Sequence, residues 1–436
     1  MRGVNPNKAL VRIQTEAARA FAARGAFGGE AEGRAAVTDS LRIRSSEETL
    51  RIARRLMPAL GISRLTDITR LDRLGVPVFA CIRPRGRVLR VHAGKGVRVG
   101  HARVGALMEA VEYAVAESAA TAGPDTVLPL RELAAQLPAG LELAAFVPLM
   151  GARLDPGRPM SAVRTEDLLG KARVLLPAEL VLMPFIDPAG PSLFGWSTDG
   201  LAAGNTLDEA TLHALLEVLE RDAMAMNQGC DASLRLSNAD LPPPFPQWAL
   251  AWQRGGVELI VRAIPNDFEL PCFAAYVHEA ASLDVNLAGG SGLHPDPQVA
   301  LMRAITEAAQ SRLSTLHGGR DTVTRFYAKY DTADEPGRQR AESQLVDELT
   351  GGPRCERFDT GTALPLSSPR AALGALLRRL HRLGHRHVFR HRIDTRRFGI
   401  DLLGLHVVRV VVPGCESMGP DPRIGPRLLQ RIVGAA

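Results

Sequence analysis

The hydrophobic residues of the 436-residue chain recur with two different periods. A helical spacing of apolar positions predicts helices over residues 45–60, around 100–118, over 200–222, around 297–313 and over 368–384. Short apolar runs between Gly and Pro predict strands at both ends of 62–84 and in 141–150, 178–186, 191–200, 257–264, 271–280, 386–394 and 402–414. This mixture predicts an α/β (α+β) protein.

The helical segment 200–222 carries acidic residues that helix formation does not require. Glu217 and Glu220 lie three residues apart, so they share one face of the helix. Ionised carboxylates at this spacing repel each other. We therefore expect a positive charge between them.

The same pattern occurs three times in the chain. In each copy two small residues, four apart, precede a pair of polar residues three apart. The copies are Ala102, Ala106, Glu109 and Glu112; Ala210, Ala214, Glu217 and Glu220; and Ala300, Ala304, Glu307 and Gln310. Three closely packed helices that bring these side chains together would form a cage for hard cations, which take oxygen ligands.

A simpler interpretation exists for any single copy. One Glu-x-x-Glu pair on a helix is most often a solvated face. Three copies with matching alanines favour the cation cage.

Two glycine-rich turns precede acidic helices. Gly94-Lys95-Gly96 comes before the first and offers one positive charge, but it lacks the pattern of a phosphate-binding P-loop and would by itself be a turn. Before the third helix, Asp296 is a candidate N-cap and Pro297 a candidate first residue.

On this third helix Arg303, Glu307 and Gln310 form one stripe. Arg303 and Glu307 could be an intrahelical ion pair. With the glycine turn at the start of the helix they could equally bind a phosphate.

The charge of the chain is uneven. The net charge is +6, and much of the excess lies in 378–397, together with His381, His385, His387 and His391. Such a patch could bind an acidic peptide, a partner protein or nucleic acid. A solvated helix end that runs into a basic strand is the simpler interpretation, and no cysteine pairs accompany the histidines as in a structural zinc site.

The cysteines and the hydropathy limit the location of the protein. Five dispersed cysteines without a Cys-x-x-Cys motif indicate a reducing compartment, and Cys81 and Cys272 fall in strand-like runs where buried thiols are expected. The first residues lack the apolar core of a signal peptide, and no stretch is long enough to span a bilayer. We expect a cytoplasmic protein without membrane contact.

Three segments resemble the YcaO family of ATP-dependent enzymes that activate peptide backbone amides. They are Gly94-Lys95-Gly96 with residues 106–112, residues 200–223 and residues 290–312. The resemblance covers about residues 45–415. It implies a YcaO-like fold of mixed sheets packed with helices, in which the three acidic helices converge on a nucleotide site.

The resemblance also implies ATP and Mg²⁺ as cofactors and a role for each polar residue of the repeat. The implied metal ligands are Glu109, Glu112, Glu217, Glu220 and Glu307. The implied nucleotide contacts are Lys95, Asn205, Glu209, Arg221, Arg303 and Gln310, and the implied catalytic residues are Glu220, Arg303 and Glu307. The sequence departs from the family pattern at Tyr113, where a basic residue is usual, and at Ala202, where a serine is common.

The family contains more than one activity. Azoline-forming relatives, which act on Cys, Ser or Thr of a precursor peptide, typically end in a Pro-x-Pro-x-Pro tail, whereas this sequence ends in RIVGAA. This difference favours the thioamide-forming type, which uses a sulfide donor and works beside a TfuA-like protein. A catalytically silent ATP-binding scaffold is the alternative from another class of protein.

The expected organisation has three parts. Residues 1–44 are an N-terminal extension that we expect to be partly mobile, 45–415 form the catalytic domain with a charged surface insertion near 320–355, and 416–436 form a C-terminal tail. The expected partners are a precursor peptide or protein substrate, a TfuA-like protein and a second copy in a homodimer. Nucleic acid is not expected as a partner.

Overall fold

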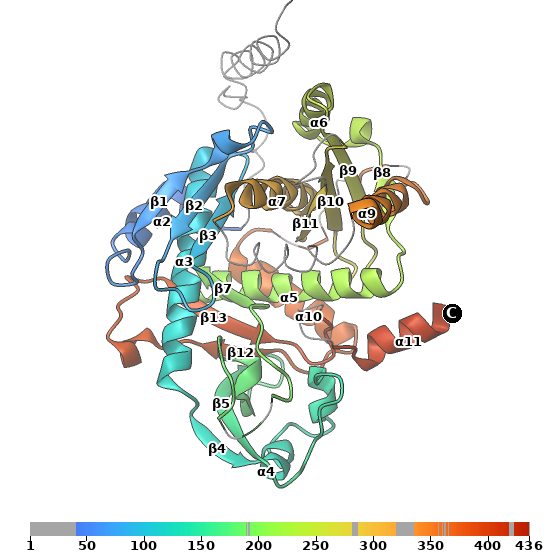
Figure 1. Cartoon of the computed structure of the whole chain (residues 1–436). Helices are drawn as coiled ribbons and strands as arrows, with labels where there is room; N and C mark the ends of the chain where they lie inside the picture. The colour runs from blue at the N-terminus through green and yellow to red at the C-terminus, as the bar shows by residue number, and fades with distance from the viewer. Residues whose placement is uncertain are drawn as a thin grey trace, which may run out of the picture.

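A computed structural model gives the mixed α/β architecture that the sequence predicts (Figure 1). The structure describes residues 41–188, 190, 192–280, 287–319, 335–355, 357–359, 361, 363–364, 366–417 and 423–435.

Five of the described helices lie close to the predicted segments, whereas the helices over 130–135 and 245–254 were not predicted. The bounds of the helices are α2 (Ser46–Arg54), α3 (Val99–Ala122), α4 (Leu130–Ala135), α5 (Leu207–Gly229), α6 (Phe245–Arg254), α7 (Pro297–His317), α9 (Glu335–Thr350), α10 (Pro369–Arg382) and α11 (Pro426–Ala435).

The strands of the described residues form three antiparallel sheets. One has the order β1 (Arg64–Asp67), β2 (Val78–Ile82), β3 (Val91–Lys95). The second has the order β11 (Leu287–Leu293), β10 (Cys272–His278), β9 (Glu258–Ala263), β8 (Leu234–Leu236). The third has the order β4 (Thr126–Pro129), β5 (Pro159–Asp167), β12 (Phe389–Arg392), β13 (His406–Val411), β7 (Leu201–Gly204), with β6 (Arg173–Pro177) paired to β5.

The repeat seen in the sequence is a strand–turn–helix unit. The three units are β3 with α3, β7 with α5, and β11 with α7, and the strand of each unit is the last strand of its sheet. All six repeated alanines are fully buried. The small residues of the repeat therefore serve close packing, as predicted.

A glycine in each strand allows this packing. A Cβ on Gly94 would lie 2.1 Å from the carbonyl oxygen of Ala102, and one on Gly292 would lie 2.2 Å from that of Ala300. Gly204 is similarly close to the amide nitrogen of Ala210, at 2.5 Å. The helix backbone can approach the strand this closely because neither side contributes a bulky side chain.

Short polar side chains cap the starts of three helices, one of them at Asp296 as the sequence predicts. The Ser45 hydroxyl accepts a hydrogen bond from the Glu48 amide before α2, and the Asp296 carboxylate accepts from the amides of Gln298 and Val299 before α7. Thr206 caps α5 in the same way. Each cap provides an acceptor for amides that lack a partner within the helix.

Three predicted strands are wrong. Residues 141–150 and 178–186 contain short 3-10 turns, at Leu143–Phe146 and Ala178–Leu180, and residues 191–200 form no strand where the structure describes them. Prolines and glycines divide this region, so its apolar residues fill the core from turns instead of from a ladder. The strands β3, β4, β5, β6, β7, β8 and β11 were not predicted. The glycines expected to form a turn before the third acidic helix lie in β11 instead.

Other predictions from the sequence agree with the structure. Cys81 and Cys272 are buried in strands. The basic segment 378–397 is the end of α10 followed by β12. Residues 1–40 of the predicted N-terminal extension and residues 320–334 of the predicted insertion lie outside the described residues. The structure describes residues 41–44 of the extension and the part of the insertion that contains α9.

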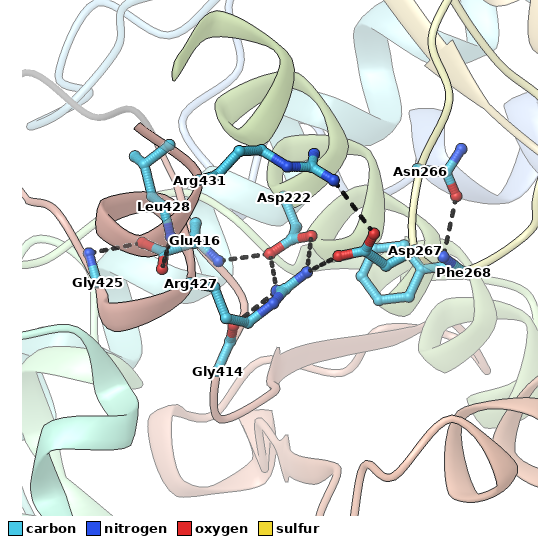
Figure 2. A network of polar contacts seen from close by, with 10 residues as sticks. All are labelled: Asp222, Asn266, Asp267, Phe268, Gly414, Glu416, Gly425, Arg427, Leu428 and Arg431. Carbon is cyan, nitrogen blue, oxygen red and sulfur yellow. Dashed lines mark hydrogen bonds and ion pairs between the residues drawn. The ribbon is translucent and has the colours of Figure 1, made fainter. Parts of the chain in front are cut away.

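The C-terminal segment is fixed to the end of α5 (Figure 2). The Arg427 guanidinium lies 2.6 Å from the Asp222 carboxylate and 2.6 Å from the Asp267 carboxylate. The buried Glu416 carboxylate accepts hydrogen bonds from the amides of Gly425 and Leu428, at the start of α11. The tail thus contacts the same helix that carries Glu217 and Glu220.

Candidate functional site

The candidate site lies where the three strand–turn–helix units meet. Helix α3 packs on β3 and reaches β7, α5 packs on β7 and reaches β11, and α7 packs on β11 and reaches β3. In Figure 1, α5 and α7 run beside each other, and α3 crosses near the start of α5. The predicted convergence of the acidic helices is therefore present in the fold.

The second polar residue of each repeat joins its helix to the strand of the next unit. Glu112 of α3 accepts a hydrogen bond from the Ala203 amide of β7 at 2.8 Å. Glu220 of α5 accepts from the Leu293 amide of β11 at 3.0 Å, and from the Ser291 hydroxyl. Gln310 of α7 donates to the Ala93 carbonyl of β3 at 3.2 Å, which closes the ring.

These contacts have a clear physical reason. A strand at the edge of a sheet leaves backbone groups without a ladder partner, and burial of such groups is costly. The polar residues of the repeat provide the missing partners. Glu109 does the same within its own unit, because it accepts a hydrogen bond from the Ala93 amide at 3.0 Å.

Positive charges lie among the carboxylates, as the repeat predicts. Lys95 Nζ lies 2.6 Å from Glu307 Oε2, so β3 and α7 are joined by an ion pair. Burial raises the pKa of Glu307, but the charges of Lys95 and Arg221 outweigh it and hold that pKa below its usual value. Burial lowers the pKa of Arg221, but Glu217 and other carboxylates outweigh it and raise that pKa.

Glu217 and Glu112 show the opposite behaviour. Burial raises the pKa of Glu217 to about 8, and Asp199 and Glu220 add to the effect. Burial also raises the pKa of Glu112 well above its usual value, with contributions from Glu217 and Glu109. Carboxylates on α3 and α5 therefore lie close enough to oppose each other's ionisation.

Glu209 and Asn205 form a separate buried group. The Glu209 carboxylate accepts hydrogen bonds from the Asn205 amide groups and from Ile43, and it pairs with Arg42 at 3.0 Å. The Asn205 side-chain oxygen accepts from Thr49. That Glu209 and Asn205 contact the nucleotide stays a prediction. The role of Arg42 was missed, because it lies in the segment assigned to the N-terminal extension.

Two histidines at the site were also missed. His213 lies on α5 midway between Glu209 and Glu217, and burial lowers its pKa well below the usual value, helped by Arg42, Arg303 and Lys95. The i, i+4 spacing of these α5 residues is the signal that could have found it. His294 follows β11, and burial, with the charge of Arg303, lowers its pKa to about 3. Both imidazoles are neutral at pH 7.

The residues fit a magnesium ion by their chemistry. The carboxylates of Asp199 and Glu220 act on Glu217, and a cation among these oxygens would relieve the repulsion that contributes to its high pKa. No group of three or more His, Cys, Asp or Glu in the described ranges is arranged to hold a metal by itself. Magnesium takes one or two carboxylates and keeps several waters, so it does not require such a group.

The raised pKa of Glu217 predicts how stability depends on pH. An unfolded Glu titrates near 4.5, whereas Glu217 titrates at about 8 in the fold. The folded protein therefore holds an extra proton between these values, and its stability falls as pH rises through this window. We expect a lower melting temperature at pH 8 than at pH 6 without Mg²⁺, and a smaller difference in Glu217→Gln. A melting temperature that rises across this range in both proteins would contradict the assignment.

Comparison with known proteins identifies the family of the chain. A family model described as YcaO cyclodehydratase, ATP- and Mg²⁺-binding, matches residues 93–416. The chain is an α/β protein, and it belongs to the YcaO family. The description of the family confirms ATP and Mg²⁺ as the expected cofactors.

Two curated relatives match most of the chain. A protein from Methanothermobacter thermautotrophicus is 32% identical over 403 residues, which is 88% of this chain and 98% of the relative. A protein from Rhizobium leguminosarum bv. trifolii is 34% identical over 396 residues, or 86% of this chain and 89% of the relative. The Rhizobium protein is described as lying in the tfuA 3′ region.

Solved structures confirm the fold. The structure of YcaO from Methanopyrus kandleri bound with AMPPCP and Mg²⁺ has a TM-score of 0.67 and 24% identity, and the match covers 90% of this chain and 98% of that one. A heterocyclase in complex with substrate and cofactor has a TM-score of 0.69 and 20% identity, and the match covers 90% of this chain and 55% of that one.

None of the helices that the structure describes has the length and apolar character needed to cross a bilayer. The cytoplasmic location stays a prediction.

Proposed function

We propose that the protein uses ATP to activate a backbone amide of a ribosomally made peptide or protein, and that a sulfur nucleophile then replaces the amide oxygen to give a thioamide. The observation that carries this proposal is the convergence of the three acidic helices with Lys95 and Arg221. The position of the Rhizobium relative beside tfuA supports the thioamide product.

The chemistry explains why such a site is needed. An amide oxygen is a poor leaving group, but it leaves as phosphate once the γ-phosphoryl group of ATP has been transferred to it. Catalysis of phosphoryl transfer consists mainly of positioning and charge stabilisation. Magnesium, when bound, neutralises charge on the phosphates.

The protein residues would then divide the remaining tasks. Lys95 and Arg303 would stabilise negative oxygens of the phosphates, and Glu109, Glu217 and Glu307 would hold the metal. Glu112, Glu220 and Gln310 would keep the three units in register through their contacts with edge strands. Glu112 and Glu220 each keep further lone pairs for a metal or its waters.

A second product has its own support. The matching family is described as a cyclodehydratase. In that reaction a Cys, Ser or Thr side chain of the substrate attacks the activated amide, and phosphate leaves without an external sulfur donor. The site residues would have the same roles in both reactions.

The test uses the purified protein with ATP, Mg²⁺, sulfide, a TfuA-like protein and a peptide encoded beside its gene. We expect sulfide-dependent replacement of one oxygen by sulfur in the peptide mass, with release of ADP. Loss of water without a need for sulfide would support the azoline product. Nucleotide binding without peptide-dependent ADP release, for every candidate peptide, would instead indicate a silent scaffold.

A further inference from the structure

A polar pocket lies between α3 and the turn that joins β2 to β3. Its volume is about 190 Å³. The lining includes three arginines of the turn and three polar residues of α3: Arg83, Arg85, Arg87, Glu117, Ser118 and Thr121. None of these residues has a role in the function proposed above.

The pocket is separate from the proposed nucleotide site. Glu109 and Glu112 are the residues of α3 assigned to that site, and neither lines the pocket. Glu117 lies five residues after Glu112, which is about 140° around the helix. Thr121 lies nine residues after Glu112, or roughly 14 Å along the helix axis. The pocket therefore lies on a different face of α3 and nearer its C-terminal end.

The turn is fixed to α3 by the carboxylate of Glu117, which is buried. Oε2 accepts a hydrogen bond from Arg83 Nη2 at 2.7 Å. Oε1 accepts from the backbone amides of Arg87 and Val88, at 3.1 Å and 3.0 Å. Glu117 thus holds both ends of the segment that carries Arg85, and its own oxygens are already engaged.

The charges of the pocket do not balance. Among the described residues that line it, Glu117 is the one carboxylate, against three guanidinium groups. A guanidinium group stays protonated in proteins. Two positive charges therefore remain, and the pocket attracts an anion.

Two of the arginines have donors that can contact a ligand. Arg85 is exposed, and its guanidinium group has no hydrogen-bond or ion-pair partner among the residues that the structure describes. Arg87 is also exposed, and its Nη1 donates to the Thr121 hydroxyl at 3.0 Å. Its Nε and Nη2 have no partner within the described parts of the chain. These nitrogens are available to an anion that enters from solvent.

Arg83 adds charge to the pocket without contacting the ligand. Its residue is 6% exposed, and Nη2 pairs with Glu117. Nε and Nη1 are buried and have no partner in the part of the chain that the structure describes. They cannot touch a ligand in the pocket. Water and salt screen a buried charge less than a surface charge, so Arg83 still attracts an anion held by its neighbours.

A phosphate group matches this arrangement better than other small ligands. The Ser118 hydroxyl donates to the Ala114 carbonyl, and the Thr121 hydroxyl donates to that of Glu117, so the guanidinium groups are the donors that remain. A phosphate carries up to two negative charges near pH 7 and accepts paired hydrogen bonds from guanidinium groups. A carboxylate carries one charge, and a neutral amide carries none.

We propose that this pocket binds a phosphate group, with Arg85 and Arg87 as the contacting residues and Arg83 as a buried charge behind them. The inference does not depend on the proposed function. Two sources share this chemistry. One is free phosphate, which both reactions considered above release, and the other is a phosphate ester on a larger molecule.

Arginine labelling with phenylglyoxal tests the proposal on the full-length protein. Mass spectrometry reads each arginine separately, so an anion bound elsewhere does not interfere. Inorganic phosphate, phenyl phosphate and acetate are added in separate samples. We expect saturating phosphate to slow the labelling of Arg85 and Arg87 at least tenfold. Arg173, an exposed arginine on β6, should be labelled at an unchanged rate.

The three probes separate the outcomes. Protection by inorganic phosphate assigns the free anion, and protection by phenyl phosphate alone assigns an ester. Labelling of Arg85 and Arg87 that neither compound slows would overturn the proposal. Protection by acetate at a lower concentration than by either phosphate compound would also overturn it, because the site would then prefer a carboxylate.

A variant measures the contribution of Arg85. Arg85→Gln removes the charge of an exposed side chain without a partner among the described residues, so we expect an unchanged melting temperature. The phosphate concentration that gives half-protection of Arg87 should rise at least tenfold. Arg173→Gln is the matched control and should require the same concentration as the unmodified protein. An unchanged concentration in Arg85→Gln would contradict the proposal.

Discussion

Glu217→Gln is expected to lower ATP consumption roughly 100-fold while the melting temperature stays the same or rises. Burial raises the pKa of Glu217 to about 8, so at pH 7 without a metal the carboxyl group is mostly protonated. Glutamine resembles this neutral form and avoids the cost of a buried charge. It cannot supply the carboxylate that a magnesium ion requires. Activity and stability should therefore change independently.

Glu117→Gln is the matched control for this prediction. Glu117 is also a buried glutamate on an acidic helix, but its carboxylate pairs with Arg83 at 2.7 Å and accepts from the amides of Arg87 and Val88. Loss of a buried ion pair costs about 3 kcal/mol. We expect a lower melting temperature with unchanged nucleotide affinity, measured by calorimetry. If Glu217→Gln behaved like this control, Glu217 would be a structural residue.

Glu220→Gln is expected to abolish measurable ADP release from a folded protein. The Glu220 carboxylate accepts from Ser291 and Leu293, and a glutamine oxygen can keep one of these contacts. The fold tolerates an amide here, because Gln310 occupies the equivalent position in the third unit and binds an edge strand. The lost property is the negative charge beside Arg221 and Glu217.

The measurement for Glu220→Gln has two parts. Circular dichroism should show a cooperative melting transition, and a coupled assay should show no ADP above background at saturating ATP and peptide. Ser291→Ala is the control, since it removes one contact of Glu220 and keeps the charge. It should retain most of the activity. Unchanged ADP release from Glu220→Gln would refute the role of its charge.

The repeat could be predicted from the sequence because the residues that define it lie close together along the chain. The alanines pack against a strand glycine, and the acidic residues recur at a fixed spacing after them, so both signals lie within about one helix length. Caps such as Ser45 and Asp296 are local in the same way. These features could therefore be found without any knowledge of tertiary contacts.

The partners of the acidic residues could not be predicted in this way. Glu112 and Glu220 bind backbone groups of strands that are far away in the sequence, and nothing in the helices specifies those strands. Arg42 pairs with Glu209 across 167 positions. The hydrogen bond from Arg409 to the Leu180 carbonyl likewise joins a strand and a turn that meet only in the folded chain.

The central claim is that the three acidic helices bind one metal–nucleotide complex. Diffraction from crystals grown with AMPPCP and Mn²⁺ in place of Mg²⁺ tests it most directly, since manganese is located by its anomalous signal. The account predicts manganese peaks within bonding distance of at least two of Glu109, Glu217 and Glu307, with the phosphates near Lys95. Nucleotide and manganese bound away from all three helices would contradict it.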